Sequence, residues 1–316
     1  MSRGDGFVDA IIRMRGISKS FGSLRANDLI DFELYPGETH ALVGENGAGK
    51  TTLMRILYGQ YKADSGTIEV DGKPVTYNVA GAMKLGIGMV HQNFMQIEKM
   101  SILENIIMAS APSRFGFIRY KETRGKVQEM LRRFGLEVSP DVPIGRLCVG
   151  ERQKVEIIKA LYLGARVLIL DEPTAVLTTQ ETAELFRELV HLKEQGYTII
   201  FISHKLREIM QITDRLTIMR GGRSMGVYNT CDVTKEEISR LMVGRDVILN
   251  VQKDKAQPTD VVLRVRDVEY VNEWHKKMLD KISFDVRRGE ILGIAGVEGN
   301  GQKELVDMLF GFLTPN

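Results

Sequence analysis

The sequence predicts an α/β fold built around a parallel sheet, and three segments predict it. Residues 39–43 are apolar and lead through a glycine-rich segment into residues 52–58, whose apolar side chains recur at helical spacing. Residues 167–170 are four branched apolar residues in a row, and residues 199–202 form a similar run. Continuous apolar runs of this length are typical of strands buried on both faces of a parallel sheet.

The glycine-rich segment fits the phosphate-binding pattern G-x-x-x-x-G-K-[ST] at every position. Between a strand and a helix, such a loop points its backbone N–H groups and the helix dipole at a phosphate. Lys50 adds a positive charge for the β- and γ-phosphates, and the Thr51 hydroxyl can ligate Mg²⁺. A chance glycine-rich turn does not explain a full match in this context. The sequence therefore predicts a nucleotide site that comprises Gly44, Glu45, Asn46, Gly47, Ala48, Gly49, Lys50, Thr51 and Thr52.

Two acids, Asp171 and Glu172, end the apolar run that begins at residue 167. The carboxyl ends of parallel strands are where open α/β sheets bind ligands. Asp171 is placed to hold Mg²⁺, and Glu172 to polarise an attacking water as a general base. An acid at the end of a strand is common, so these two acids indicate a catalytic site only because the same chain also has the phosphate loop. The sequence contains no Asn-Lys-x-Asp element, which would have indicated guanine as the base.

Three further segments indicate which family of nucleotide-binding proteins the chain resembles. Residues 89–92 are predicted to form a strand that ends in Gln92, residues 147–151 open a long amphipathic helix, and residues 199–204 end in His204. With these five ordered motifs, the chain resembles the ATP-binding subunits of ABC transporters over essentially its whole length. The resemblance implies the P-loop NTPase fold of the ABC ATPase type, with an antiparallel β subdomain and a helical subdomain at about residues 93–165.

The resemblance also implies roles for individual residues. Glu172 matches the catalytic glutamate, and His204 matches the switch histidine that contacts the γ-phosphate. Gln92 matches the loop glutamine that touches Mg²⁺, which Thr51 and Asp171 would also hold. Phe21 falls where the family stacks an aromatic ring under adenine, because a flat π-face suits a base. An ordinary core phenylalanine is an equally good interpretation of Phe21.

The helical subdomain receives a coupling helix from the membrane subunit in the family. Residues 101–107 are predicted to begin a helix just after the glutamine loop. A plain packing helix needs one apolar face as well, so the pattern does not separate the two interpretations.

The sequence departs from the family pattern at two places that contact ATP or the neighbouring domain across the domain pair. The signature is usually Leu-Ser-Gly-Gly-Gln, and its serine and glycine touch the γ-phosphate of ATP on the opposite domain. Here Cys148 replaces the serine, while Gly150 is kept. A thiol is a weak donor, so Cys148 is expected to bind the phosphate less well. Residues 175–178 lack the aspartate that usually follows the catalytic glutamate.

A second glycine-rich segment repeats the first at a constant offset. Gly289 corresponds to Gly37 and Gly296 to Gly44 (289 − 37 and 296 − 44 both give 252). Such self-similarity indicates a duplicated domain. At this offset Lys50 corresponds to Gln302, so the second loop lacks the phosphate-binding lysine. We expect one ABC ATP-binding domain at residues 6–245, a linker at 246–260, and the N-terminal fragment of a second such domain, cut short, at 261–316.

The duplicated form resembles bacterial importers of simple sugars and nucleosides. In that family two ATP-binding domains pair head to tail, and each ATP lies between the loop of one and the signature of the other. The weak signature at Cys148 would then face the weak loop at Gln302, which leaves one competent site. The resemblance implies ATP and Mg²⁺ as cofactors, and a dimer of ATP-binding domains, from one chain or two. It also implies membrane permease subunits and, through them, an extracytoplasmic solute-binding protein.

Composition limits the other function classes. The chain carries 43 basic and 41 acidic residues, a net charge of +2, which offers no electrostatic argument for nucleic acid. The spacing of its two cysteines matches no metal-binding or redox motif. We therefore expect a protein of a reducing compartment such as the cytosol. No apolar segment approaches the ~20 residues that span a bilayer. We expect a peripheral protein on the cytoplasmic face of the membrane.

Two alternatives stay open. A soluble ABC ATPase that acts on ribosomes or DNA also has paired domains, but usually with a long charged linker or a large insertion. A non-hydrolysing ATP-dependent switch would not need Glu172, Gln92 and His204.

Overall fold

The computed structural model describes residues 9–92, 94–108, 113–114, 117–118, 120–244, 256–272, 276–296 and 299–314. The chain divides into two compact units, Met1–Val247 and Ile248–Asn316. The expected linker at 246–260 lies largely outside the described residues. The division of the chain into domains stays a prediction.

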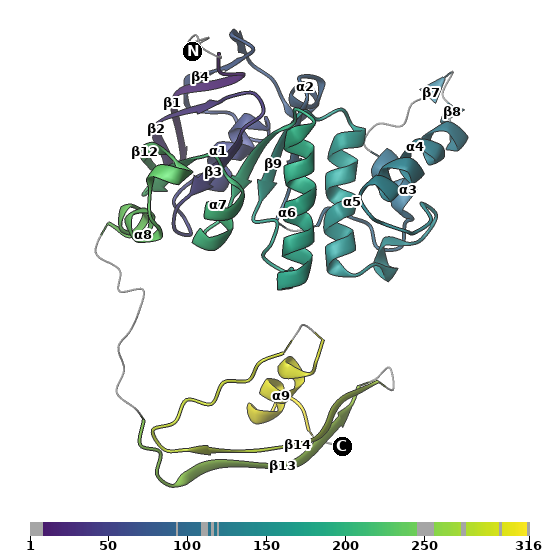
Figure 1. The fold of residues 1–316 in the computed structure, drawn as a ribbon, viewed down its shortest axis with the longest axis vertical. Helices are drawn as coiled ribbons and strands as arrows, with labels where there is room; N and C mark the ends of the chain where they lie inside the picture. The colour runs from purple at the N-terminus through teal and green to yellow at the C-terminus, as the bar shows by residue number, and fades with distance from the viewer. Residues whose placement is uncertain are drawn as a thin grey trace, which may run out of the picture. The chain divides into compact units, whose positions relative to one another are not determined.

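The first unit is built on a six-stranded sheet in the order β12-β11-β3-β10-β9-β6 (Figure 1). All neighbours pair in parallel except β12 with β11. Every residue of the three central strands is buried, as their continuous apolar sequence predicts. The strands are β3 (Thr39–Val43), β6 (Ile87–Val90), β9 (Val167–Asp171), β10 (Thr198–Ile202), β11 (Arg215–Arg220) and β12 (Arg223–Asn229).

A second, antiparallel sheet lies beside the first in the order β2-β1-β4-β5. Helix α1 (Lys50–Leu57) packs its apolar face into the core that the two sheets share, which includes Met14, Leu53 and Ile200. The strands are β1 (Ile12–Phe21), β2 (Leu24–Leu34), β4 (Ser65–Val70) and β5 (Lys73–Val75), and α2 (Val79–Lys84) follows them. The expected antiparallel β subdomain is therefore confirmed.

Three helices gather at one end of the first unit: α3 (Ile102–Ile107), α4 (Tyr120–Arg133) and α5 (Val149–Tyr162) (Figure 1). Ser101 caps α3, because its hydroxyl accepts from the Glu104 N–H while the Glu104 carboxylate accepts from the Ser101 N–H. The buried residues of these helices join Leu168, Leu170 and Phe201 in one core. Short strands β7 (Ser113–Arg114) and β8 (Phe117–Ile118) lie between α3 and α4 in sequence.

The remaining helices of this unit are α6 (Thr179–Glu194), α7 (Leu206–Ile212) and α8 (Lys235–Val243), with 3₁₀ turns at Ile144–Arg146 and Thr230–Asp232. Alternate residues of β10 contact different cores: Phe201 faces the core that contains α6, and Ile200 faces the core that contains α1. The sheet is thus covered on both faces, which is why its strands are apolar throughout.

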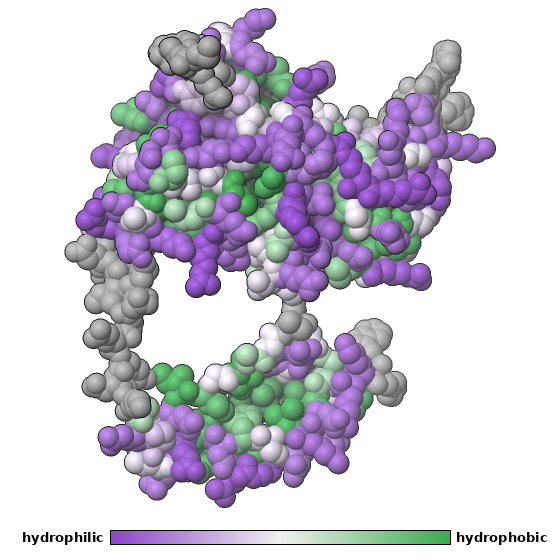
Figure 2. All heavy atoms as spheres, viewed as in Figure 1, coloured by the Kyte–Doolittle hydropathy of each residue, from purple (hydrophilic) through white to green (hydrophobic). Residues whose placement is uncertain are grey.

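The second unit contains a hairpin, β13 (Val261–Val271) with β14 (Lys277–Arg287), and helix α9 (Gln302–Leu309). Helix α9 occupies the positions that correspond to α1 at the offset of 252, since 302 − 50 and 309 − 57 both give that number. Ile291, Phe310 and Phe312 are strongly exposed. Figure 2 shows hydrophobic residues gathered on one face of this unit.

In the part of the chain that the structure describes, no helix is long and apolar enough to cross a membrane.

Candidate functional site

The glycine-rich loop after β3 has the backbone conformation that its glycines permit. Gly47 and Gly49 have φ angles of 82° and 95°, in the left-handed region that favours glycine. A Cβ at Gly49 would also overlap the backbone carbonyl oxygen of Ala26. The loop therefore needs glycine at position 49 for both conformation and space.

Lys50, the first residue of α1, lies folded onto this loop. Its Nζ donates to the carbonyl oxygens of Gly44 at 2.7 Å and Glu45 at 2.9 Å, and the residue is 5% exposed. Burial lowers the pKa of Lys50, while the charges of Glu172 and Asp171 act in the opposite direction. The ammonium group thus lies at the loop and close to the two acids.

The end of β9 meets the start of α1 at these acids. The Thr51 hydroxyl donates to Oδ1 of Asp171 at 3.2 Å. Asp171 is 3% exposed, and burial, together with the nearby charge of Glu172, raises the pKa of its carboxyl. An acid of this kind favours a nearby cation, because a positive charge offsets the cost of keeping the carboxylate ionised away from water.

Glu172 is the centre of a three-way contact. Its Oε1 lies 3.1 Å from Nδ1 of His204, and its Oε2 accepts from Nε2 of Gln92 at 3.3 Å. These residues follow β9, β10 and β6, three parallel strands whose carboxyl ends meet at one sheet edge. Glu172 also has a φ of 47°, a strained value for a side chain of this type. Backbone strain at such a position is typical of a functional site.

A buried network behind this contact was not predicted from the sequence. Glu208 on α7 is 8% exposed and accepts from the Thr174 hydroxyl at 2.7 Å and the Ser203 hydroxyl at 3.1 Å. Lys205 lies 3.2 Å from the same carboxylate. Thr174 is two residues after Glu172, and Ser203 directly precedes His204, so Glu208 ties together the two segments that carry them. The only signal in the sequence is an acid one helical turn after His204.

Phe21 lies on the surface, at the end of β1. It is 44% exposed and contacts Tyr61 edge to face, with ring centroids 5.3 Å apart. The interpretation of Phe21 as a core residue is therefore wrong. Nζ of Lys19 lies over the ring, 5.6 Å from its centroid.

Cys148 and Gly150 belong to a separate cluster at the first turns of α5 and α6. The Cys148 Sγ lies 3.9 Å from Oε1 of Glu181, and a Cβ at Gly150 would lie 2.5 Å from the same oxygen. Burial raises the pKa of the thiol, and the charge of Glu151 acts in the same direction. Among the described residues, the structure thus joins Lys50, Thr51, Asp171, Glu172, Gln92 and His204 in one site and keeps Cys148 apart from it.

The chain is similar to several known proteins. Residues 28–175 match the family model described as ABC transporter. The chain is 44% identical over 304 residues to the nucleoside import ATP-binding protein NupA of Lactococcus lactis, covering 96% of this chain and 60% of that protein. It is 42% identical over 302 residues to the ribose import ATP-binding protein RbsA 1 of Rubrobacter xylanophilus, covering 95% and 59%. The chain spans about 60% of the length of these relatives.

Two solved structures are similar to about three quarters of this chain. CbiO1 of Clostridium perfringens, described as part of the ABC transporter complex cbiONQ, is 30% identical, with a TM-score of 0.65; the match covers 73% of this chain and 93% of that one. The ADP conformation of MJ1267, an ATP-binding cassette of an ABC transporter, is 25% identical at the same TM-score, with coverage of 74% and 95%. From its motifs, its fold and these similarities, the chain belongs to the ABC transporter family and has the fold of its ATP-binding cassettes.

Proposed function

We propose that this chain binds and hydrolyses ATP to power the uptake of a simple sugar or nucleoside through a membrane permease. One observation carries the proposal: the hydrogen-bonded group that links Thr51 to Asp171 and Glu172 to both His204 and Gln92. The names of the relatives, which include importers of nucleosides, ribose and glucose, support this class of solute.

The phosphates of ATP fit the loop at residues 44–51. A glycine-rich loop at a helix N-terminus offers backbone N–H groups to an anion, and the helix dipole at the start of α1 favours an anion as well. Lys50 is buried at the loop, where its Nζ donates to the backbone carbonyl oxygens of Gly44 and Glu45, and a phosphate would compensate its charge better than neutral carbonyls do. Thr52 belongs to the same first turn. Phe21 would stack on the adenine.

The residues present also fit Mg²⁺. This ion prefers oxygen ligands and is usually held by one or two carboxylates together with substrate phosphates. Thr51 and Asp171 offer a hydroxyl and a carboxylate that already lie 3.2 Å apart, and the Gln92 amide lies at the same sheet edge. Within the described ranges, no cluster of three or more His, Cys, Asp or Glu side chains could hold a metal by itself. A Mg²⁺ site in which phosphate oxygens complete the ligands of Thr51 and Asp171 agrees with this absence and with the position of those two oxygens. When bound, the ion would neutralise charge on the phosphates.

Glu172 would act as the general base that takes a proton from the attacking water. The imidazole of His204 and the amide of Gln92 hold the two carboxylate oxygens in place, and the side chain is about one-sixth exposed, so water can reach it. Glu208 would act as a positioning residue, because its bonds to Thr174 and Ser203 fix the segments that carry Glu172 and His204.

The remaining partners follow from the same proposal. A permease in the membrane would dock on the helical subdomain at residues 93–165, and an extracytoplasmic solute-binding protein would deliver the solute to that permease. The chain would work as a peripheral protein at the cytoplasmic face. Cys148 and Gly150 would serve an ATP on a second ATP-binding domain, either in residues that continue the repeat at 261–316 or in another copy.

The test is a comparison of Glu172→Gln with the unaltered chain in Mg-ATP binding and ATP turnover, over a range of protein concentrations. Glu172→Gln should keep binding and lose turnover, since it removes the proton acceptor and leaves the phosphate loop intact. Glu188→Gln, on α6, is the matched control and should change neither. Substantial residual turnover in Glu172→Gln would contradict the assigned base. Turnover by the unaltered chain that rises with the square of concentration would mean that two copies complete each other's sites through Cys148.

A further inference from the structure

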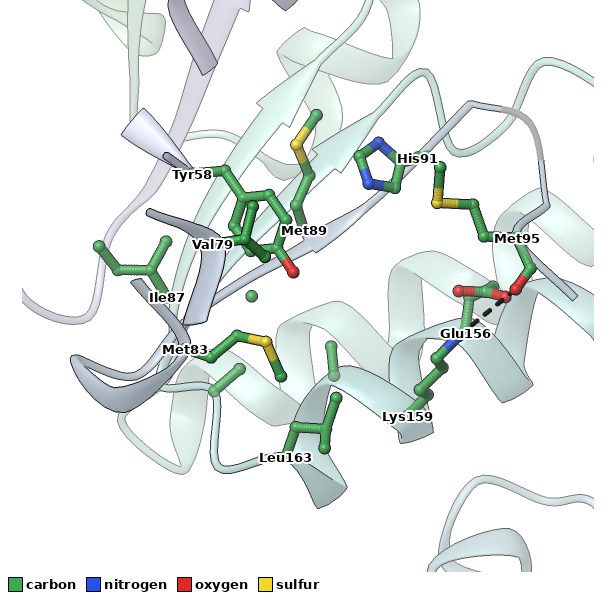
Figure 3. Close-up of a pocket in the computed structure, with 13 residues that line it drawn as sticks. Tyr58, Val79, Met83, Ile87, Met89, His91, Met95, Glu156, Lys159 and Leu163 are labelled. Atoms are coloured by element: carbon green, nitrogen blue, oxygen red, sulfur yellow. Dashed lines mark hydrogen bonds between the residues drawn. The ribbon is translucent and has the colours of Figure 1, made fainter. Parts of the chain in front are cut away.

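Two buried polar side chains of the first unit have partners of different kinds. Figure 3 shows Glu156 in the wall of a pocket of about 220 Å³ between α2, the end of β6 and α5. The side chain of Gln96 hydrogen-bonds to this carboxyl, far from the phosphate loop in sequence. Asn27 of β2 differs, because its partner belongs to the phosphate loop itself. Its Nδ2 donates to the backbone carbonyl oxygen of Gly49 at 3.1 Å.

Packing alone does not explain an asparagine at this position. Asn27 is 0% exposed, and within the described residues its Oδ1 has no hydrogen-bond partner. A buried amide that is only half paired costs free energy. The repeat has Leu279 at the corresponding position (279 − 27 gives 252), and Leu279 is also buried. The fold therefore accepts an apolar side chain here.

The two positions also correspond in space. A Cβ on Gly49 would lie 2.7 Å from Nδ2 of Asn27, and a Cβ on Gly301 would lie 2.8 Å from Cδ2 of Leu279. The buried amide is thus found beside the loop that has Lys50. The leucine is found beside the loop that has Gln302 instead. A residue that lowers stability is expected where function requires it, so this pairing indicates a role for the amide in phosphate binding.

The bond from Asn27 acts on the peptide that joins Gly49 to Lys50. The Gly49 carbonyl also accepts from the N–H of Leu53 at 3.0 Å, so two donors hold it. The C=O and N–H of a planar trans peptide point in opposite directions, so donors that fix this carbonyl also fix the direction of the Lys50 N–H. The first N–H groups of a helix have no partner inside the helix and are available to an anion. A hydrogen bond to the carbonyl also strengthens the N–H as a donor.

Gly49 needs such support because it has no side chain of its own. It is the N-cap of α1, with a φ of 95° and no side-chain cap bond. Glycine has wide backbone freedom, so the next peptide keeps one orientation only where other groups hold it. The preceding carbonyl, of Ala48, accepts from the N–H of Gly222 at 3.2 Å. Asn27 provides the corresponding restraint one peptide further along.

We propose that Asn27 is a positioning residue of the ATP site, whose side-chain amide holds the Gly49–Lys50 peptide so that the Lys50 N–H is offered to a bound phosphate. This assignment rests on the proposed function and adds to it a residue outside the phosphate-binding motif. Asn27 raises affinity and lowers stability, two effects that a purely structural residue does not combine.

The test compares Asn27→Leu, which copies the repeat, with Asn27→Ala. Both remove the donor, so both should weaken Mg-ATP binding by ~3- to 10-fold, the range for one neutral hydrogen bond. Their stabilities should differ: the urea midpoint of the first unit should stay equal or rise in Asn27→Leu and fall in Asn27→Ala, which leaves a cavity. Asn229→Ala is the matched control, since the Asn229 amide donates to Asp232 on the surface. It should keep the affinity.

Calorimetric titration gives both the affinity and the fraction of the chain that binds. An unchanged affinity in Asn27→Leu would overturn the assignment. So would a loss of affinity in Asn27→Ala alone, because affinity would then follow stability. A reduced binding fraction with an unchanged affinity would show damage to the fold and would also overturn it.

A second ligand locates the effect within the nucleotide. Strand β2 follows β1, which ends in Phe21, so a change at residue 27 could also act on the adenine. Inorganic tripolyphosphate has no base, and its affinity, measured by displacement of a fluorescent ATP analogue, should weaken by the same factor as that of Mg-ATP. An effect on Mg-ATP alone would place the action of Asn27 at the base and contradict the assignment.

Failure of this assignment is distinguishable from failure of its premise. Lack of Mg-ATP binding by the unaltered chain would contradict the proposed function. Binding of equal affinity by the unaltered chain and both Asn27 variants would contradict only the role of Asn27.

Discussion

The segment β3–loop–α1 and the described residues of its repeat, 291–296 and 299–309, share glycine conformation and a helix but differ in the strand. Gly47 and Gly299 have φ angles of 82° and 87°, and helices α1 and α9 cover corresponding positions. In contrast, β3 is buried throughout, whereas residues 291–296 form no strand and Ile291 is 83% exposed. The loop and helix therefore form from short-range sequence, while the strand needs its neighbours.

The neighbours of β3 come from much later in the chain. It pairs in parallel with β10 on one side and β11 on the other. Among the described residues, no strand pairs with residues 291–296. Parallel pairing requires a long connection, so a strand of this type depends on distant sequence. The comparison teaches that an apolar pattern allows a segment to form a parallel strand, and that the strand forms only where other strands pair with it.

The largest expected difference between the two segments concerns Leu42 and Ile294, which correspond at the offset of 252. Leu42→Ala removes a fully buried side chain and should cost about 2–5 kcal/mol of unfolding free energy. Ile294→Ala removes a side chain that is 49% exposed and should cost less than about 1 kcal/mol. Urea unfolding followed by circular dichroism gives both values. Similar costs would mean that residues 291–296 are as well packed as β3.

The next difference concerns the phosphate-binding lysine. Lys50→Ala should weaken Mg-ATP binding by ~10- to 100-fold, because a charged hydrogen-bond donor contributes about 1.5–3 kcal/mol. Gln302→Ala, at the corresponding position, should leave the affinity unchanged. Calorimetric titration with Mg-ATP measures both variants. Weakened binding in Gln302→Ala would place the second loop at an ATP site and contradict the expected asymmetry.

A third pair tests what the two loops share. Gly49 and Gly301 have φ angles of 95° and 88°, and a Cβ on either would overlap a backbone carbonyl oxygen, of Ala26 or Met278. Gly49→Ala and Gly301→Ala should each cost about 1–3 kcal/mol of stability in their own unit. Only Gly49→Ala should also weaken Mg-ATP binding. Hydrogen exchange of each unit, with a nucleotide titration, distinguishes the two effects. A Gly301→Ala variant of unchanged stability would show that the second loop tolerates a side chain.

The smallest effect is a pH dependence that only the first segment should have. His40 of β3 is buried and contacts Glu38 and Thr217, and Leu292 takes its place in the repeat. Burial lowers the pKa of His40, and its hydrogen bond to Glu38 only partly opposes this. The unfolded chain therefore binds the proton more readily, so stability is present above about pH 6.5 and falls below it, by up to about 1.4 kcal/mol per pH unit.

Urea midpoints at pH 7.5 and pH 5.5 measure this loss. His40→Leu, which copies the repeat, should lower the sensitivity of the first unit to pH over that range. A first unit whose stability is equal at the two pH values would contradict the neutral state of buried His40.

The sequence by itself predicted the α/β class, the apolar strands at residues 39–43, 167–170 and 199–202, and helices over residues 52–58 and opening at residues 147–151, and the structure has each of these elements with ends shifted by a residue or two. It could do so because strand burial, helical periodicity and glycine turns are short-range patterns. It also proposed the phosphate loop and the acids Asp171 and Glu172, since a motif of adjacent residues carries its own geometry. Their roles in catalysis stay predictions.

Only the tertiary structure decided which distant groups meet. The exposure of Phe21 and the network of Glu208 with Thr174 and Ser203 have no local signal. Each depends on segments that are far apart in the chain and are brought together by sheet order and helix packing. Burial and hydrogen bonding are properties of those contacts, and a sequence pattern records a residue's own preference but not its partner.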